Sequence, residues 1–84
     1  MYNLKDTFEM QGYRAFLFVS EEPVVTAKVI RLHHCDGSNF DISDVDFGRF
    51  TQCFSNNQTQ GFRTKTIVPE KYLQAGTRLE LLEK

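Results

Sequence analysis

The sequence predicts a mostly β fold: a small antiparallel curled sheet or partly open barrel of five to six strands, with one short helical turn before the last strand. Two observations support this prediction. Short runs of aromatic and β-branched residues recur along the chain between turn-forming residues, as in hairpin-linked strands. Closing such strands into a barrel also removes unpaired sheet edges, which would otherwise recruit other chains. An α+β sheet covered by a short helix is the alternative.

The first predicted strand covers residues 13–19. It is rich in aromatic and β-branched residues and is apolar on both faces, which indicates that both faces are buried or that one face meets a second subunit. Residues 3–11, before it, mix charged residues with Leu4 and Phe8, whose spacing allows one or two helical turns. A frayed arm or an edge strand is the alternative for this stretch.

The clearest predicted strand covers residues 24–34. Its apolar alternation changes parity midway, and a β-bulge near Val29 and Ile30 would place its apolar residues on one face. Asp36-Gly37 then predicts a tight hairpin turn, because both central residues of such a turn need positive φ angles. Residues 38–42 return as the next strand.

The second half of the chain continues the alternation of strands and polar connections. Pro69 favours the first position of a short helical turn, and Gly76 suits the end of that turn. The predicted elements are a polar corner at 44–46, strands at 47–55, 62–68 and 77–82, a polar loop at 56–61 and the helical turn at 69–75.

Length and charge indicate a single domain, residues 1–84, that gains from self-association. A chain of this length buries only about 60–65% of its unfolded surface, so its stability margin is thin and burial shared with a partner helps. The formal net charge is −1. A dedicated duplex-DNA binder usually carries a clear positive excess, whereas near-neutral charge does little to oppose association of like chains.

Cysteine content and apolar runs indicate a cytoplasmic protein that does not enter a membrane. Cys35 and Cys53 are too few for a disulfide framework, and we expect both thiols to be reduced. The first residues lack the charged start and apolar run of a signal peptide. The longest apolar run, residues 15–19, is far too short to cross a bilayer.

Two histidines, a cysteine and an aspartate stand side by side at the end of the second predicted strand. Adjacent strand residues point to opposite faces, so only His33 with Cys35, or His34 with Asp36, can act together. Zinc prefers four convergent ligands, and Cys53 could join only if its strand were a neighbour. We therefore expect no metal, no cofactor and no catalytic residues. A thiol enzyme using Cys35 and His33 is an alternative hypothesis.

Four aspartates, Asp36, Asp41, Asp44 and Asp46, are close together in the sequence and raise the question of a hard-cation site. An EF-hand loop needs a glycine at its sixth position, whereas Gly37 occupies the second position counted from Asp36. We interpret these aspartates as a solvated acidic corner.

Aromatic and basic residues alternate in the two strands predicted at 47–55 and 62–68. In an antiparallel pair with an even-length loop, Phe50 and Phe54 share a face with Arg63 and Lys65. Such a face resembles the platforms on which single-stranded nucleic acid stacks its bases and pairs its phosphates. The alternative is that both phenylalanines belong to the core, with the long basic side chains covering the edge.

The sequence motifs assign the chain to no known family. No phosphate-cradling glycine loop and no Ser/His/Asp arrangement is recognisable in the sequence. We therefore expect a small non-enzymatic binding module that acts as a homo-oligomer, most simply a dimer, with an unidentified protein partner. Single-stranded nucleic-acid binding through Phe50, Phe54, Arg63 and Lys65 is the alternative.

Overall fold

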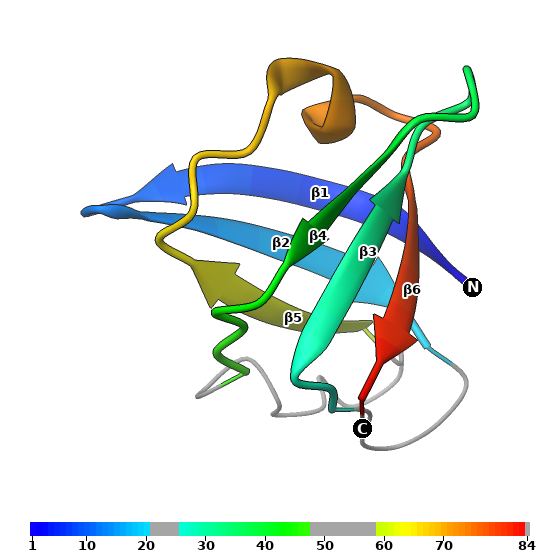
Figure 1. The fold of residues 1–84 in the computed structure, drawn as a ribbon. Coiled ribbons are helices and arrows are strands. Elements are labelled where there is room, and N and C mark those ends of the chain that lie inside the picture. The colour runs from blue at the N-terminus through cyan, green and yellow to red at the C-terminus, as the bar shows by residue number, and fades with distance from the viewer. Residues whose placement is uncertain (21–25, 48–58, 84) are drawn as a thin grey trace.

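The structure, a computed structural model, describes residues 1–20, 26–47 and 59–83 of the chain (Figure 1). The described secondary structure is made almost entirely of short strands. Its elements are β1 (Tyr2–Met10), β2 (Tyr13–Val19), β3 (Val29–His33), β4 (Asn39–Ile42), β5 (Thr59–Thr64), the 3-10 turn η2 (Glu70–Leu73) and β6 (Arg78–Leu82).

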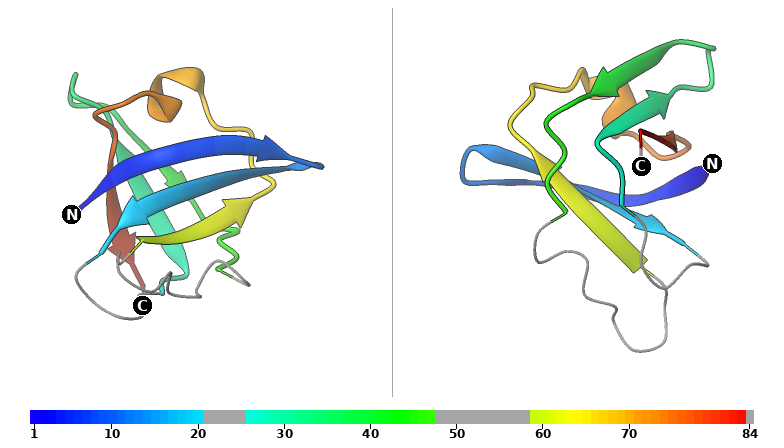
Figure 2. Two further views of the ribbon diagram at one scale, coloured as in Figure 1. Left: turned by 180° about the vertical axis from the view of Figure 1, so that it is seen from behind. Right: turned by 60° about the horizontal axis from the view of Figure 1, so that its bottom comes forward.

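The six strands form one antiparallel sheet in the order β4-β3-β6-β1-β2-β5. The sheet is curled, so that β1, β2 and β5 make one layer and β3, β4 and β6 cross it in a second layer (Figures 1 and 2). Only the first residues of β1 join the layers on one side, where Tyr2 and Asn3 pair with β6. The predicted fold class, a curled antiparallel sheet with one helical turn before the last strand, is confirmed.

The other side of the curl is bridged by the segment that follows β4. Asp46 and Arg63 exchange two backbone hydrogen bonds, with the Asp46 N–H donating at 3.0 Å and the Arg63 N–H at 2.8 Å. β5 is the last strand on its side of the sheet, and these two bonds satisfy the backbone of Arg63 on the edge that faces away from β2. The exposed polar row of an edge strand is a hazard for aggregation, and this bridge shortens it.

The core lies between the two layers. Phe16 and Phe62 stack with their ring centroids 5.1 Å apart, and both side chains are completely buried. The Phe47 ring packs against Phe62 at 5.9 Å. Each fully buried side chain of this size contributes about 1.5–3 kcal/mol, so a few aromatics stabilise this small core. The buried cluster consists of Phe16, Phe18, Ala27, Ile30, Leu32, Ile42, Phe47, Phe62, Val68, Tyr72 and Leu79.

The N-terminal segment is a strand, and the prediction of helical turns there is wrong. β1 pairs with β2 through a tight hairpin in which Gly12 has a φ of +76°. Its ladder with β6 is limited to Tyr2 and Asn3, so the rest of β1 forms an edge of the sheet, as the edge-strand alternative predicts. The register shifts between Leu4 and Asp6. Because of this shift, Leu4 packs against the core and Phe8 lies on the opposite, exposed face. The spacing of four residues between them therefore does not mark one face of a helix.

The strand predicted at 24–34 is shorter than expected, and its predicted bulge is wrong. β3 begins at Val29 and pairs in unbroken register with β4 and β6. Ile30 and Leu32 are buried on one face of the strand, while Ala27 is buried from a segment outside it. The apolar pattern changes from odd-numbered to even-numbered positions near Val29 because the strand begins there.

Strands are found at 13–19, 38–42 and 77–82 as predicted, within a residue, and η2 occupies the predicted turn. β5 starts and ends earlier than the predicted 62–68, because Gln60 and Gly61 pair with β2 and the Thr66 N–H turns back to the Thr64 hydroxyl. The strand predicted at 47–55 lies outside the described residues, apart from Phe47.

Candidate binding surface

The β1-β2-β5 layer has two faces with different surroundings. Directly paired residues share a face, and alternate residues of one strand point to opposite faces. The face that carries Phe16, Phe18 and Phe62 packs on the core. The opposite face, here called the outer face, points away from the core. Its cross-strand rows are Phe8-Ala15-Arg63, Asp6-Leu17-Gly61 and Met10-Tyr13, and Val19 lies on the same face at the end of β2.

Apolar side chains from two neighbouring strands remain accessible on the outer face. Phe8 is 39% exposed and Val19 is 49% exposed, while Leu17 between them is half-buried. We call Phe8, Leu17 and Val19 the apolar patch. Scattered single apolar residues on a surface need no explanation, whereas adjoining ones on one sheet face are candidates for an interaction site.

An aromatic ring and two cations meet at the hairpin end of the same face. The guanidinium carbon of Arg63 lies 4.5 Å from the centre of the Tyr13 ring, and Lys65 Nζ lies 5.3 Å from it. We call these three residues the Tyr13 cluster. Arg63 Nε donates to Asp46 Oδ2 at 2.9 Å, and this hydrogen bond raises the pKa of Arg63. Cations near ring faces gain about 0.5–1 kcal/mol at exposed sites.

The structure brings together two of the four predicted nucleic-acid contacts. Arg63 and Lys65 lie over one ring, and that ring belongs to Tyr13, which sequence reasoning placed on β2 without assigning it to the site. The pairing of β2 with β5 brings Tyr13 there, and no local pattern signals a pairing between segments so far apart in the chain. Phe50 and Phe54 lie outside the described residues.

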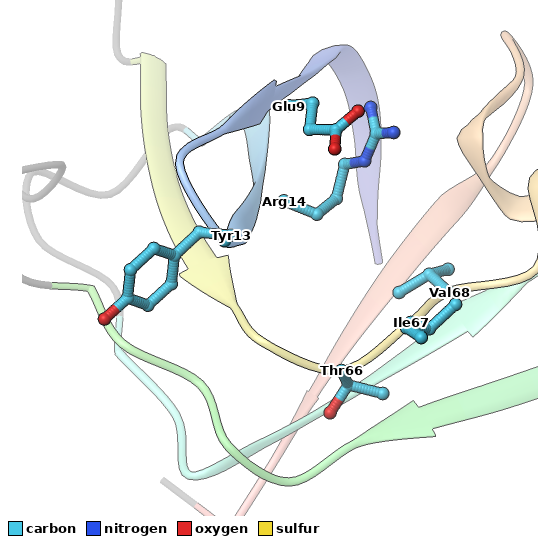
Figure 3. A pocket seen from close by; sticks show the side chains of 7 residues that line it. Glu9, Tyr13, Arg14, Thr66, Ile67 and Val68 are labelled. Atoms are coloured by element: carbon cyan, nitrogen blue, oxygen red, sulfur yellow. The ribbon is translucent and has the colours of Figure 1, made fainter.

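Two shallow hollows flank the Tyr13 cluster. One, of about 450 Å³, is lined by Glu9, Met10, Gln11, Tyr13 and Arg63. The other, of about 250 Å³, extends from Tyr13 and Arg14 to Thr66, Ile67 and Val68. Figure 3 shows the charged ends of Glu9 and Arg14 turned toward one another and the Tyr13 ring pointing away from them. The larger hollow is within the size range of small-ligand sites.

The histidines near Cys35 are engaged in separate contacts. His33 Nε2 lies 2.9 Å from Glu80 Oε1, which links β3 to β6. His34 Nδ1 accepts the Asp36 backbone N–H at 3.1 Å and lies 3.8 Å from Cys35 Sγ. The exposed Cys35 thiol thus contacts the ring of His34, while the ring of His33, its predicted partner, contacts Glu80. In the described ranges, no three histidine, cysteine or acidic side chains gather where they could hold a metal ion; Cys53 lies outside them.

Each of the four aspartates of the acidic corner makes hydrogen bonds or an ion pair with a different set of residues. The Ser38 hydroxyl, at 2.6 Å, keeps the pKa of Asp36 well below its usual range. A hydrogen bond from Arg31 lowers the pKa of Asp41. Asp46 pairs with Arg63, and Asp44 accepts donors from the end of β5. These carboxylates face separate partners and do not converge.

No family model, no curated protein and no solved structure matches this chain. Among the described residues, the structure contains no helix of the length and apolar character needed to cross a membrane.

Proposed function

We propose that the protein is a non-enzymatic interaction module that forms a two-fold dimer through the apolar patch. The observation that carries the proposal is the accessibility of Phe8 and Val19 beside Leu17 on an outer face whose opposite side already forms the core. A second copy of the chain is the proposed occupant, because the patch is flanked by charges of both signs that can complement one another across a two-fold axis.

The charge arrangement supports a specific orientation of that dimer. Asp6 lies on β1, on one side of β2, and Arg63 lies on β5, on the other side. A two-fold axis that runs along β2 in the plane of the interface places β1 of one copy over β5 of its partner. Asp6 of each copy then faces the side of the partner that carries Arg63, and Gly61 leaves room for the apolar side chains.

The energy available predicts a weak dimer. Full burial of Val or Phe is worth about 1.5–3 kcal/mol, so covering the exposed parts of Phe8 and Val19 gains about 1 kcal/mol each, or about 4 kcal/mol for two copies. Association costs about 4–15 kcal/mol. A dissociation constant of about 1 μM needs a net gain of about 8 kcal/mol. Leu17, the flanking charges and the residues around the layer must therefore supply most of the free energy of the dimer, and dissociation is expected at micromolar concentration or above.

The size of the face agrees with this expectation. A standard interface takes about 800 Å² per partner, roughly 15% of the 5357 Å² of accessible surface. Three strands of seven residues cover roughly 330 Å² in projection. The apolar patch can form the centre of the contact, with residues around the layer completing it. We further propose a cytoplasmic location, where the exposed Cys35 thiol stays reduced.

Sedimentation velocity over a range of micromolar concentrations tests the proposal. The unmodified chain should shift from the 9.8 kDa monomer toward twice that mass as the concentration rises. Val19→Lys removes the patch contact and places an ammonium in each half of the interface, so it should weaken the dimer by about 100-fold or more, since 1.4 kcal/mol is tenfold.

Ile67→Lys is the matched control, because it introduces the same charge at an apolar side chain that is 92% exposed and outside the patch. It should leave the dimer unchanged. A monomer at every concentration would refute the proposed dimer. A dimer weakened by Ile67→Lys and unaffected by Val19→Lys would show that a different surface is used.

A further inference from the structure

We propose that the Tyr13 cluster binds single-stranded nucleic acid, with one base stacked on the Tyr13 ring and the adjoining phosphate paired with Lys65 and Arg63. The inference goes beyond the proposed dimer and rests on the hairpin end of the same outer face. Along β2, Tyr13 is six residues from Val19, or about 20 Å at the rise of a strand. The Tyr13 ring therefore lies at the opposite end of β2 from Val19, whereas Arg63 shares a cross-strand row with Phe8 of the patch. We expect the monomer to bind the oligonucleotide, and the dimer to compete with it for Arg63.

The first argument is the accessibility of the ring. Tyr13 is only half-buried and lines the hollow of about 450 Å³ on the outer face. The chain offers a direct comparison in Tyr72, which also has a lysine nitrogen, that of Lys71, 5.3 Å from its ring centre. Tyr72 is only 3% exposed and belongs to the core. Of these two tyrosines, only Tyr13 can take a base. A base that stacks on its ring takes the place of one of the two cations over the ring and leaves that cation free to pair with the phosphate.

The second argument is the chemistry of the cations. Lys65 is exposed, and its side chain approaches the Tyr13 ring. Arg63 has five N–H donors and uses Nε for Asp46, so this ion pair engages part of its capacity. Stacking on aromatic rings beside cations that meet phosphates is how sequence-tolerant single-strand binders work. An acidic peptide would satisfy the cations, but it has no need of the ring face.

The surrounding charges predict that binding is weak. Glu9 lines the same hollow, and Asp46 partly neutralises Arg63. The expected footprint is one or two nucleotides, with a dependence of log affinity on log salt of about −0.7 per neutralised phosphate. One or two phosphate contacts therefore predict a slope of about −0.7 to −1.4. This is much shallower than the slope of a dedicated nucleic-acid binder.

Fluorescence anisotropy with a labelled oligothymidylate tests the inference on the full chain. Lys65→Glu should weaken binding by about tenfold or more, because it reverses the charge beside the ring. The matched control is Lys71→Glu, which reverses the charge of the lysine over the buried Tyr72 and should leave binding within about twofold.

Substitutions of Tyr13 separate stacking from charge. Tyr13→Leu keeps an apolar side chain and should cost about tenfold in affinity, whereas Tyr13→Phe keeps the ring and should retain binding. Circular dichroism establishes that each variant is folded. Val19→Lys should still bind the oligonucleotide even where it abolishes the dimer, so failure of one proposal is distinguishable from failure of the other.

Three outcomes would overturn the inference. Absence of saturable binding at low salt is the first. Equal losses for Lys65→Glu and Lys71→Glu would indicate diffuse attraction without a site. Tighter binding of an acidic peptide than of the oligonucleotide, lost on Lys65→Glu but not on Tyr13→Leu, would identify the cluster as a protein contact.

Discussion

Removing the carboxylate of Asp44 should destabilise the fold more than removing any other aspartate of the acidic corner. Asp44 follows β4 and accepts three donors from the end of β5: the Thr64 hydroxyl, the Thr66 hydroxyl at 2.6 Å and the Lys65 backbone N–H at 2.9 Å. Beside it, Asp46 makes the two backbone hydrogen bonds to Arg63 that bridge the curl. The carboxylate therefore ties the open side of the sheet together.

The expected magnitude follows from these contacts. A hydrogen bond to a charged group is worth about 1.5–3 kcal/mol when protected, but Asp44 is exposed and water replaces part of what is lost. We expect Asp44→Ala to cost about 2 kcal/mol in the free energy of unfolding. Asp41→Ala removes a bidentate but exposed pair with Arg31, at 2.7 and 3.0 Å, and should cost about 0.5 kcal/mol.

Urea denaturation at neutral pH measures both variants, and thermal unfolding provides an independent check. For a domain of this size, about 2 kcal/mol corresponds to a fall in Tm of roughly 8–16 °C. Asp41→Ala is the matched control, because it makes the same chemical change at a neighbouring aspartate. If the two variants differ by less than about 0.5 kcal/mol, the bracing role assigned to Asp44 is wrong.

The same carboxylate should contribute to loss of stability in acid. Although Asp44 is exposed, its contacts remove part of the water around the carboxyl, which acts to raise its pKa. The hydrogen bonds from Thr64, Thr66 and Lys65 outweigh this and hold the pKa below its usual value. A carboxylate with a lowered folded pKa stabilises the fold above its unfolded pKa of about 3.9, and that stability disappears as pH falls through the folded pKa. Asp44→Asn should therefore flatten the loss of stability below about pH 4.

Two further predictions concern the core and the β3–β4 turn. Phe62→Ala should destabilise the protein by about 3–5 kcal/mol in urea denaturation, because it leaves a cavity beside the stacked Phe16 and the Phe47 ring; a cost below about 1 kcal/mol would contradict the proposed core. Gly37→Ala should lower the stability by about 1 kcal/mol in the same assay, because Gly37 has a φ of +93° while an added Cβ would meet no atom within 4 Å. No change would show that the turn relaxes.

Local patterns predicted those parts of the fold in which neighbouring residues decide the conformation. Asp36-Gly37 was sufficient to locate the hairpin of β3 and β4, since the positive φ of Gly37 is a property of the turn itself. Aromatic and β-branched content likewise located residues 13–19, and alternation located the last strand. For residues 3–11 the choice between helical turns and an edge strand stayed open, because the register shift between Leu4 and Asp6 breaks the period that marks a strand.

The candidate site could be predicted only in part. Arg63 and Lys65 are two positions apart, which puts both on one face of an extended segment, and the predicted hairpin placed Phe50 and Phe54 on that face. The ring beneath them was not identified, because Tyr13 reaches them through pairing between strands separated by about half the chain. Patterns within one segment carry no information about which distant segment becomes its neighbour.

By itself, the sequence determined that this chain forms a curled sheet of short antiparallel strands, because alternation, turn residues and aromatic content all act over a few residues. Only the tertiary structure decided that β2 lies between β1 and β5 and that Asp44 and Asp46 close the curl. It also decided which side of β2 stays accessible. Residues 13–19 are apolar on both faces, and which face becomes the core depends on the partners that the whole chain brings to it.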